Sequence, residues 1–598
     1  MNTFNSRNEF YKKPFGAIKE NQEIFFRVAV EKGFSQPSLC MKRDNEQSQF
    51  FLMDYETEQD GKVIFTVRFV PKACGLYFYC FSFGYDNVAI YNVGKGNGEV
   101  SANGEWFLQT VYSEDFSTPN KAKGGVLYQI FPDRFFESTE KKSLHFSDRF
   151  YRTDKDGQPY FYPTEQKGGY LNKDYYGGDL KGIMSKLDYI KSLGVSYIYL
   201  NPIFEAHSNH RYNTADYMKI DPDLGTLEDF TLLCSKAKSM GISIVLDGVF
   251  SHTGSDSIYF NKEGRYGEGG AYRKEDSEYR EWYDFDKKYK CGYRAWWGFE
   301  TLPEVNERNP RYIDYVCGKG GVIDYWLQNG ADGFRLDVAD ELPDESIAAL
   351  RIAVKRNGDD KLLIGEVWED AVTKISFEKR RTYLLGKGLD SVMNYPFRVA
   401  VLNFIKNGDG DNFCESILKI CENYPKEALD TAWNSLSTHD TPRAMTFLCA
   451  EDPDSTDRYW QDGRVLSPEM HEKAKKWLVC AYALLFGLPG VPCIYYGDEI
   501  GMEGYRDPFN RGYFKWWRQD KFIQDKIKTM AEFRNSNPLF SGGGIYFAHS
   551  SANCVAFIRF ENNKEVLVGA NRGEWDESFI YHDKTYTIKA NDFLNLSL

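Results

Sequence analysis

Eight short apolar runs mark out the middle of the chain, and most of them end in a polar residue suited to chemistry. They are Gly124–Pro132, Val195–Pro202, Ile242–Val249, Gly333–Asp337, Leu362–Trp368, Leu389–Tyr395, Ala432–Asp440 and Pro489–Asp498. Most intervals hold an amphipathic segment with helical spacing, for example Leu180–Leu193 and Thr226–Met240. A strand followed by a helix, repeated eight times, predicts an α/β fold: a closed (β/α)8 TIM barrel with its active site at the carboxyl ends of the strands.

Carboxylates stand at or near these predicted strand ends, namely Asp247, Asp337, Glu366 and Asp440. Arg335 and Asp337 are two residues apart on one strand, so their side chains point the same way. Two charges there are costly unless they are paired. The segment therefore holds either a structural ion pair or an aspartate that Arg335 keeps ionised, which suits a nucleophile.

Glu366 follows an apolar run and precedes Trp368. Apolar surroundings disfavour a charged carboxylate, so the sequence predicts a glutamic acid that keeps its proton near neutrality. One ionised and one protonated carboxyl on adjacent strands are the groups that glycoside hydrolysis requires.

A chain of 598 residues is too long for one hydrophobic core, and its pattern divides into three predicted domains. Residues 1–121 contain only strand-like runs and predict a β-sandwich, for carbohydrate binding or dimerisation. Residues 122–537 form the barrel, with an aromatic-rich inserted subdomain at about 251–306, since so long a loop without structure is improbable. Residues 538–598 alternate again and predict a small β-domain.

Composition limits the partners and the compartment. The formal net charge of −13 disfavours a nucleic-acid partner, because such binding needs clustered Lys and Arg. The twelve cysteines include no CxxC pair, and Met1–Glu20 has no apolar segment of a signal peptide, so we expect the cytoplasm. The apolar run Trp477–Tyr496 is interrupted by Gly487 and Pro489, which predicts a buried helix, a turn and a strand rather than a membrane span.

Four strand-end motifs occur in order: Asp247-Gly-Val-Phe-Ser-His252, Gly333-Phe-Arg-Leu-Asp337, Gly365-Glu-Val-Trp368 and Ser437-Thr-His-Asp440. Together with Leu302–Asn306 they resemble the α-amylase family of glycoside hydrolases, over nearly the whole chain. Further stretches resemble the neopullulanase, cyclomaltodextrinase and maltogenic amylase subgroup, as does an all-β domain ahead of the barrel. These stretches are Tyr128–Phe135, Ser208–Asp216, Met393–Pro396, His439–Arg443 and Tyr496–Met502.

The resemblance implies a role for each matching residue. Asp337 would be the nucleophile, Glu366 the general acid and base, and Asp440 a third carboxylate that binds sugar hydroxyls. The remaining matches would orient the nucleophile or bind substrate: Arg335, His210, Tyr212, Asp247, His252, His439, Asp507 and Arg511. Trp368, Trp297 and Phe299 are either aromatic platforms for the leaving-group side or ordinary packing.

The chain departs from the family pattern at its calcium sites. Ser251 stands where many members have an Asn that helps bind calcium, and Ser is a poorer ligand for a hard cation. Only Gly177 and Asp179 fit the later ligands of a second calcium loop. We therefore expect no required cofactor, with calcium as an alternative at Gly177 and Asp179. Asp340 adds a negative charge where the subgroup usually has Asn.

The sequence thus predicts a retaining hydrolase of α-1,4 and, as an open alternative, α-1,6 glucosidic bonds in maltodextrins, cyclodextrins or pullulan. A 4-α-glucanotransferase would use the same site, and a sugar-binding barrel without activity would be expected to lose at least one of the three carboxylates. Barrel and carboxylates alone also permit an enolase-type metal enzyme, which the clustered aromatics and the lack of further acidic ligands disfavour. A homodimer through the N-terminal domain, with no membrane partner, remains open.

Overall fold

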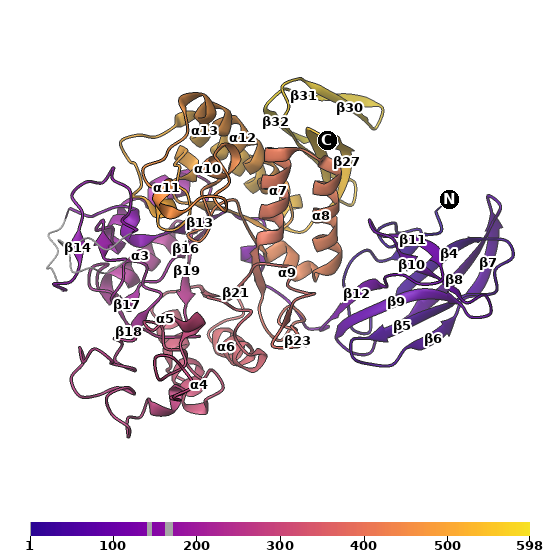
Figure 1. Ribbon diagram of the computed structural model, residues 1–598. Coiled ribbons are helices and arrows are strands. Elements are labelled where there is room, and N and C mark those ends of the chain that lie inside the picture. The colour runs from indigo at the N-terminus through magenta and orange to yellow at the C-terminus, as the bar shows by residue number, and fades with distance from the viewer. Residues whose placement is uncertain (1, 140–145, 162–171) are drawn as a thin grey trace. The chain divides into compact units, whose positions relative to one another are not determined.

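The computed structural model describes residues 2–139, 146–161 and 172–598, shown as a ribbon in Figure 1. These residues fall into two compact units. The first contains Met1–Ser117, Glu369–Asp390 and Cys414–Leu429, and the second contains Thr118–Trp368, Ser391–Phe413 and Asp430–Leu598.

A closed barrel of eight parallel strands forms the centre of the second unit, as the sequence predicts. Each strand lies within one of the eight apolar runs. In barrel order they are β13 (Leu127–Ile130), β16 (Tyr197–Leu200), β19 (Ser243–Gly248), β20 (Gly333–Leu336), β21 (Leu362–Val367), β24 (Ser391–Asn394), β25 (Trp433–Ser435) and β26 (Val491–Tyr495). Inward-facing apolar side chains such as Tyr199, Ile364 and Trp433 fill the interior, so the barrel is a packed core.

Helices follow the barrel strands, and several of them begin at a residue whose side chain caps the first turn. Thr226 and Asp229 form a reciprocal capping box at the start of α3, and Ser467 caps α12 ahead of Pro468. The helices are α1 (Leu180–Ser185), α2 (Leu187–Ser192), α3 (Leu227–Ser239), α4 (Pro310–Cys317), α5 (Val322–Gln328), α6 (Asp344–Arg356), α7 (Tyr395–Asn407), α8 (Gly410–Asn423), α9 (Lys426–Thr431), α10 (Ala444–Cys449), α11 (Arg458–Gln461), α12 (Pro468–Gly487) and α13 (Lys521–Asn535).

The run Trp477–Tyr496 is the end of α12, a turn and β26, as predicted. None of the helices in the described ranges combines the length and apolar character needed to cross a membrane.

The segment between β19 and α4 is held mainly by aromatic packing. Phe260 packs against Tyr283, Phe285 and Tyr293, with ring centroids 4.7–5.6 Å apart. Isolated bridges, including His252 to Glu304, tie its two ends together. Side-chain packing therefore orders this insertion, although its sequence has little helical periodicity.

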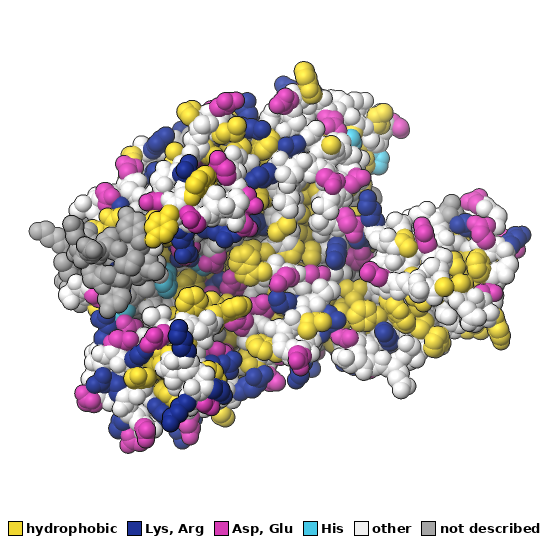
Figure 2. Space-filling view, in the orientation of Figure 1, with side chains coloured by type: hydrophobic (Ala, Val, Ile, Leu, Met, Phe, Trp, Pro, Cys, Tyr) yellow, Lys and Arg dark blue, Asp and Glu magenta, His cyan; other side chains and the backbone are white. Residues whose placement is uncertain are grey.

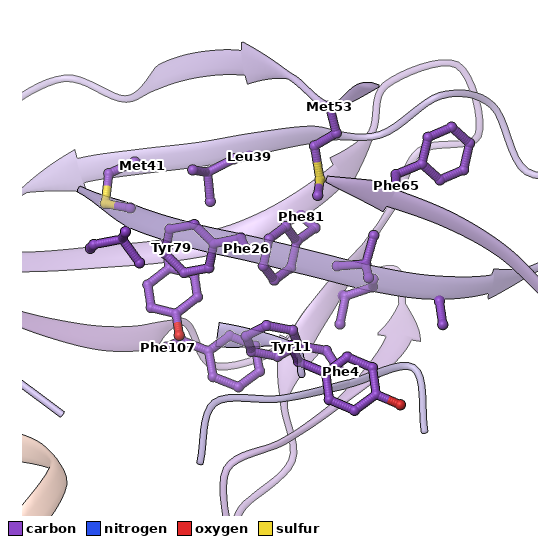
Figure 3. Close-up of a cluster of buried hydrophobic side chains, with 14 of the residues drawn as sticks. Phe4, Tyr11, Phe26, Leu39, Met41, Met53, Phe65, Tyr79, Phe81 and Phe107 are labelled. Atoms are coloured by element: carbon purple, nitrogen blue, oxygen red, sulfur yellow. The ribbon is translucent and has the colours of Figure 1, made fainter. Parts of the chain in front are cut away.

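Two sheets make up most of the first unit, and all their strand pairs are antiparallel except the parallel pair β3–β12. One sheet contains β1 (Phe4–Asn5), β3 (Ile18–Lys19), β5 (Ser38–Arg43), β6 (Gln49–Leu52), β9 (Gly75–Phe83), β10 (Val88–Asn92), β11 (Asn97–Ser101) and β12 (Phe107–Tyr112). The other contains β2 (Lys12–Lys13), β4 (Ile24–Glu31), β8 (Lys62–Phe69) and β7 (Asp54–Gln59). Figure 3 shows the shared core, where Phe4, Phe26, Tyr79, Phe81 and Phe107 meet.

The chain ends in a four-stranded antiparallel sheet and a hairpin. The sheet order is β27 (Gly544–Ser550), β28 (Cys554–Glu561), β29 (Lys564–Asn571) and β32 (Asp592–Ser597), and the hairpin is β30 (Glu577–Tyr581) with β31 (Lys584–Ile588). Three short two-stranded sheets complete the described strands: β14 (Phe150–Tyr151) with β15 (Asp174–Tyr175), β17 (Phe204–Ala206) with β18 (Thr214–Ile220), and β22 (Ile375–Ser376) with β23 (Lys379–Arg380). The predicted fold class is confirmed. The domain boundaries drawn from the sequence remain predictions.

Candidate active site

Strand register brings the predicted carboxylates together at one end of the barrel. Asp247 on β19 pairs with Arg335 on β20, and Leu336 pairs with Gly365 on β21. The next residues along β20 and β21 are Asp337 and Glu366, so these two carboxyls are neighbours at the carboxyl ends of adjacent strands.

The guanidinium of Arg335 holds three carboxylates. Its Nη1 lies 2.7 Å from Asp247 Oδ1 and 2.8 Å from Asp337 Oδ1, and its Nη2 lies 2.8 Å from Glu366 Oε2. The Arg335 side chain is fully buried, and those of Asp337 and Glu366 are 10% and 6% exposed. The ion pair between Arg335 and Asp337 is thus present, and the same cation also binds Glu366.

Glu366 is buried, but its neighbours are more polar than its sequence suggests. Its Oε2 accepts the backbone N–H of Val338 (3.0 Å) and its Oε1 accepts the indole N–H of Trp368 (3.0 Å). Val338 has a φ of 39°, which is costly for a β-branched residue and typical of functional sites. Burial raises the pKa of Glu366, against the influence of Arg335, so the predicted direction is found although the surroundings are not simply apolar.

The pKa of Asp337 differs from the sequence expectation. Burial raises the pKa of Asp337 well above its ordinary value, and the charges of Glu366, Asp247 and Asp440 raise it further. Arg335 lowers it, as predicted, but does not outweigh burial. Two adjacent buried carboxyls beside one cation resist ionising together, so the protonation of Asp337 and that of Glu366 are coupled.

Asp440 lies beside His439 and Arg511. Its Oδ2 is 2.9 Å from His439 Nε2 and its Oδ1 is 3.3 Å from Arg511 Nη2. Burial raises the pKa of Asp440, but His439 and Arg511 lower it more, so the carboxylate is held ionised. Arg511 also pairs with Asp507 at 2.8 Å, which links the two predicted sugar-binding residues. The Asp440 side chain is 31% exposed and therefore accessible to a ligand.

Three rings form a row beside these carboxylates. Tyr212 stacks on His439 with centroids 5.2 Å apart and planes 4° apart, and His210 stacks on Tyr212 at 5.9 Å. Burial lowers the pKa of His210 well below its ordinary value, so this ring is neutral. A row of flat rings suits the apolar face of a sugar.

Asp247 and His252 occupy fixed positions behind the site. Asp247 Oδ2 accepts the hydroxyls of Tyr199 (2.6 Å) and Tyr212 (2.7 Å), in addition to its pairing with Arg335, and its side chain is fully buried. The geometry gives Asp247 a positioning role, and direct sugar contact stays a prediction. Ser251 Oγ lies 2.9 Å from His252 Nδ1, and burial lowers the pKa of His252 to about 4.

The predicted aromatic platforms are exposed. Trp368 is 44% exposed and stacks on Tyr395 at 4.0 Å, while Phe299 is 57% and Trp297 is 77% exposed. Glu341 fixes the inserted loop, since its carboxylate accepts the indole N–H groups of Trp296 (2.8 Å) and Trp297 (2.9 Å).

The sequence indicated no role for four residues that contact the site. Gln129 Nε2 lies 3.0 Å from His439 Nδ1, and the other three are Tyr199, Glu341 and Tyr395. Glu341 lies four residues after Asp337, and the Tyr199 side chain points into the barrel from the second strand. Neither position in the sequence indicated the residue that is contacted, namely Trp296 and Trp297 for Glu341 and Asp247 for Tyr199.

Gly177 and Asp179 lie at the start of α1. Asp179 caps this helix through the N–H of Gly182 (2.6 Å) and also accepts Ser138 Oγ (2.8 Å). Gly177 has a φ of 82° and donates its N–H to Asp133. Helix capping accounts for the Asp179 carboxylate, and calcium binding there remains a prediction.

A parallel barrel that presents neighbouring carboxyls and a third carboxylate beside aromatic rings has the arrangement of a glycoside hydrolase active site. A family model described as "Alpha amylase, catalytic domain" matches residues 129–539. The chain belongs to the α-amylase family.

Similar proteins support the subgroup as well. The chain is 32% identical to neopullulanase 2 of Thermoactinomyces vulgaris, over 77% of this chain and 72% of that protein. It is 34% identical to an amylopullulanase of Thermoanaerobacter thermohydrosulfuricus, over 93% of this chain and 40% of the relative. The solved cyclic α-maltosyl-(1→6)-maltose hydrolase of Arthrobacter globiformis, in complex with that cyclic sugar, is 28% identical, with a TM-score of 0.68 over 81% of this chain and all of that one.

The resemblance to the neopullulanase, cyclomaltodextrinase and maltogenic amylase subgroup is confirmed. The chain spans a third to a half of the length of the amylopullulanases that it matches.

Proposed function

We propose that this protein is a retaining α-glucan hydrolase that cleaves α-1,4-glucosidic bonds. The observation that carries the proposal is the binding of Asp337 and Glu366 to the two terminal nitrogens of the single Arg335 guanidinium. Both carboxyls therefore face one small volume. Retaining glycosidases need such proximity, since their two carboxyls are in general about 5–5.5 Å apart.

In this mechanism Glu366 donates its proton to the glycosidic oxygen while Asp337 attacks the anomeric carbon. The C–O bond to the leaving sugar breaks, and a covalent glucosyl ester of Asp337 forms. Water then attacks the ester, Glu366 takes a proton from that water, and the product leaves with its α configuration. The Asp440 carboxylate binds sugar hydroxyls, and its negative charge favours the positive charge that develops on the ring.

The proposed substrates are maltodextrins, cyclodextrins and pullulan, and α-1,6 bonds are included. The names of the relatives support this range, since they include a neopullulanase and a hydrolase of a cyclic (1→6)-linked maltose dimer. The exposed rings of Trp368 and Phe299 are suited to the leaving-group sugars.

A 4-α-glucanotransferase would use the same covalent intermediate with a sugar in place of water. Maltotriose digests, followed over time by thin-layer chromatography, distinguish the two activities. Hydrolysis yields maltose and glucose throughout, whereas early accumulation of oligomers longer than maltotriose identifies transfer. Asp337→Asn is the matched control, and activity equal to wild type in this variant would remove Asp337 from the reaction.

We further propose that the protein acts in the cytoplasm and forms a homodimer through its N-terminal β-rich region. The twelve free cysteines support a reducing compartment. Lys, Arg, Asp and Glu side chains are interspersed over the face seen in Figure 2. Such a mixture of charges disfavours binding to a polyanion such as nucleic acid, which needs clustered positive charge. Size-exclusion chromatography with light scattering tests the dimer.

A further inference from the structure

We propose that His549, Cys554 and Glu577 form a zinc-binding site in the C-terminal β-sheet region, remote from the proposed active site. The three residues come from β27, β28 and β30, and their ligand atoms all lie within 4.8 Å of one another. Across the described ranges, this is the only group of three or more His, Cys, Asp or Glu side chains arranged closely enough to hold one metal ion.

The chemistry of the three donors selects the metal. A thiolate disfavours calcium and magnesium, which bind oxygen ligands, whereas sulfur, imidazole and carboxylate together suit Zn²⁺. Zinc bonds of about 2.0–2.3 Å separate tetrahedral ligands by about 3.4 Å. His549 Nε2 and Glu577 Oε1 are 2.8 Å apart, so the His549 and Glu577 side chains need to move apart only slightly to admit the ion. Water supplies the fourth ligand.

The surroundings hold the ligands in place. His549 stacks on Phe579 with centroids 5.0 Å apart and planes 10° apart, which fixes the orientation of the imidazole. A register shift between Phe547 and His549 marks a bulge in β27, and bulges commonly re-aim the side chain that follows. Cys554 is fully buried in the local hydrophobic core, while His549 and Glu577 are 21% and 29% exposed. The ion therefore has an entry path on one side and a dry thiol on the other.

Ordinary packing is the competing explanation, with a surface His–Glu ion pair above a core cysteine. Burial raises the pKa of the Cys554 thiol to about 12, so without a metal it stays protonated and unreactive. The two explanations differ in what would hold the two C-terminal sheets together. His549 and Cys554 belong to the four-stranded sheet, and Glu577 begins the β30–β31 hairpin, whose strand β31 contacts β29 and β32. Figure 1 shows this hairpin beside β32. A bound ion would tie these two sheets together, whereas a surface ion pair contributes little.

The test uses the full chain, purified without a polyhistidine tag and freed of metal with a chelator. Co²⁺ is the spectroscopic probe, because thiolate coordination gives a near-ultraviolet charge-transfer band and tetrahedral visible bands. We expect these bands at one Co²⁺ per chain, displacement by Zn²⁺, and a rise of about 2–4 °C or more in Tm with saturating Zn²⁺.

Cys554→Ser and His549→Gln should lose the charge-transfer band and the Zn²⁺-dependent rise in Tm. Cys234→Ser is the matched control, since Cys234 is also buried but lies on α3, and it should keep both. A wild-type protein without a thiolate–cobalt band would overturn the proposal. The same band and stoichiometry in both Cys554→Ser and His549→Gln would also overturn it. If Cys554→Ser does not fold, the wild-type spectrum and His549→Gln decide.

Discussion

Arg335→Lys is the substitution that most directly probes how the two carboxyls are held. Arg335 uses Nη1 for Asp337 and Nη2 for Glu366, and one ammonium group cannot occupy both positions. The variant keeps the positive charge but loses either the Nη1 hydrogen bond to Asp337 or the Nη2 ion pair with Glu366. A buried hydrogen bond to a charged group is worth about 1.5–3 kcal/mol. Because kcat/KM compares the free enzyme with the transition state, the loss counts only as far as the contact strengthens when charge develops on the two carboxyls. If it strengthens by its full value, kcat/KM falls by about 10- to 150-fold, since each 1.36 kcal/mol is tenfold.

The assay is steady-state release of glucose and maltose from maltotriose, with Tm measured on the same samples. Arg559→Lys is the matched control, because Arg559, on β28, is equally buried but donates to the backbone carbonyls of Gly487 and Gly543. It should lose stability without a comparable loss of kcat/KM. The reasoning is refuted if folded Arg335→Lys keeps kcat/KM within about twofold of wild type, a change well below the loss expected for one charged contact.

Three further substitutions separate the proposed roles. Asp337→Asn removes the nucleophile and should lower turnover by several decades with little change in Tm, whereas near-wild-type activity on maltotriose would exclude that role. Burial raises the pKa of Glu366, and a general acid works only while protonated, so the wild-type rate should fall as pH rises through that pKa. Glu366→Gln should lose this alkaline limb, and its persistence would contradict the assignment. Trp368→Phe keeps the ring over Tyr395 but loses the indole N–H donated to Glu366. We expect kcat to drop about fivefold, which corresponds to about 1 kcal/mol, with KM little changed. An unchanged kcat would show that this hydrogen bond does not contribute to catalysis.

The barrel and the carboxylate positions were predictable because strand period and strand-end chemistry are local signals. All eight strands lie in the predicted runs, and Thr226 and Met240, the predicted ends of one helix, are the N-cap and C-cap of α3. The strands β4, β9 and β12 were equally readable, because their sequences are rich in apolar, aromatic and β-branched residues.

The missed features depend on contacts between distant residues. β7 is exposed along its whole length and carries no apolar alternation, so nothing in its sequence marks a strand. The shared Arg335 and the raised pKa of Asp337 require knowledge that three carboxylates converge on one buried guanidinium. The Glu341 clamp joins residues 44 or 45 positions apart, and no local pattern predicts it.

The stereochemistry of the first product tests the central claim most directly. Proton NMR recorded within the first turnovers, before mutarotation, resolves the anomers of maltose released from a maltodextrin. Attack by Asp337 followed by attack of water predicts the α anomer. Release of the β anomer would mean that water displaces the leaving sugar in one step, and Asp337 would then not be a nucleophile.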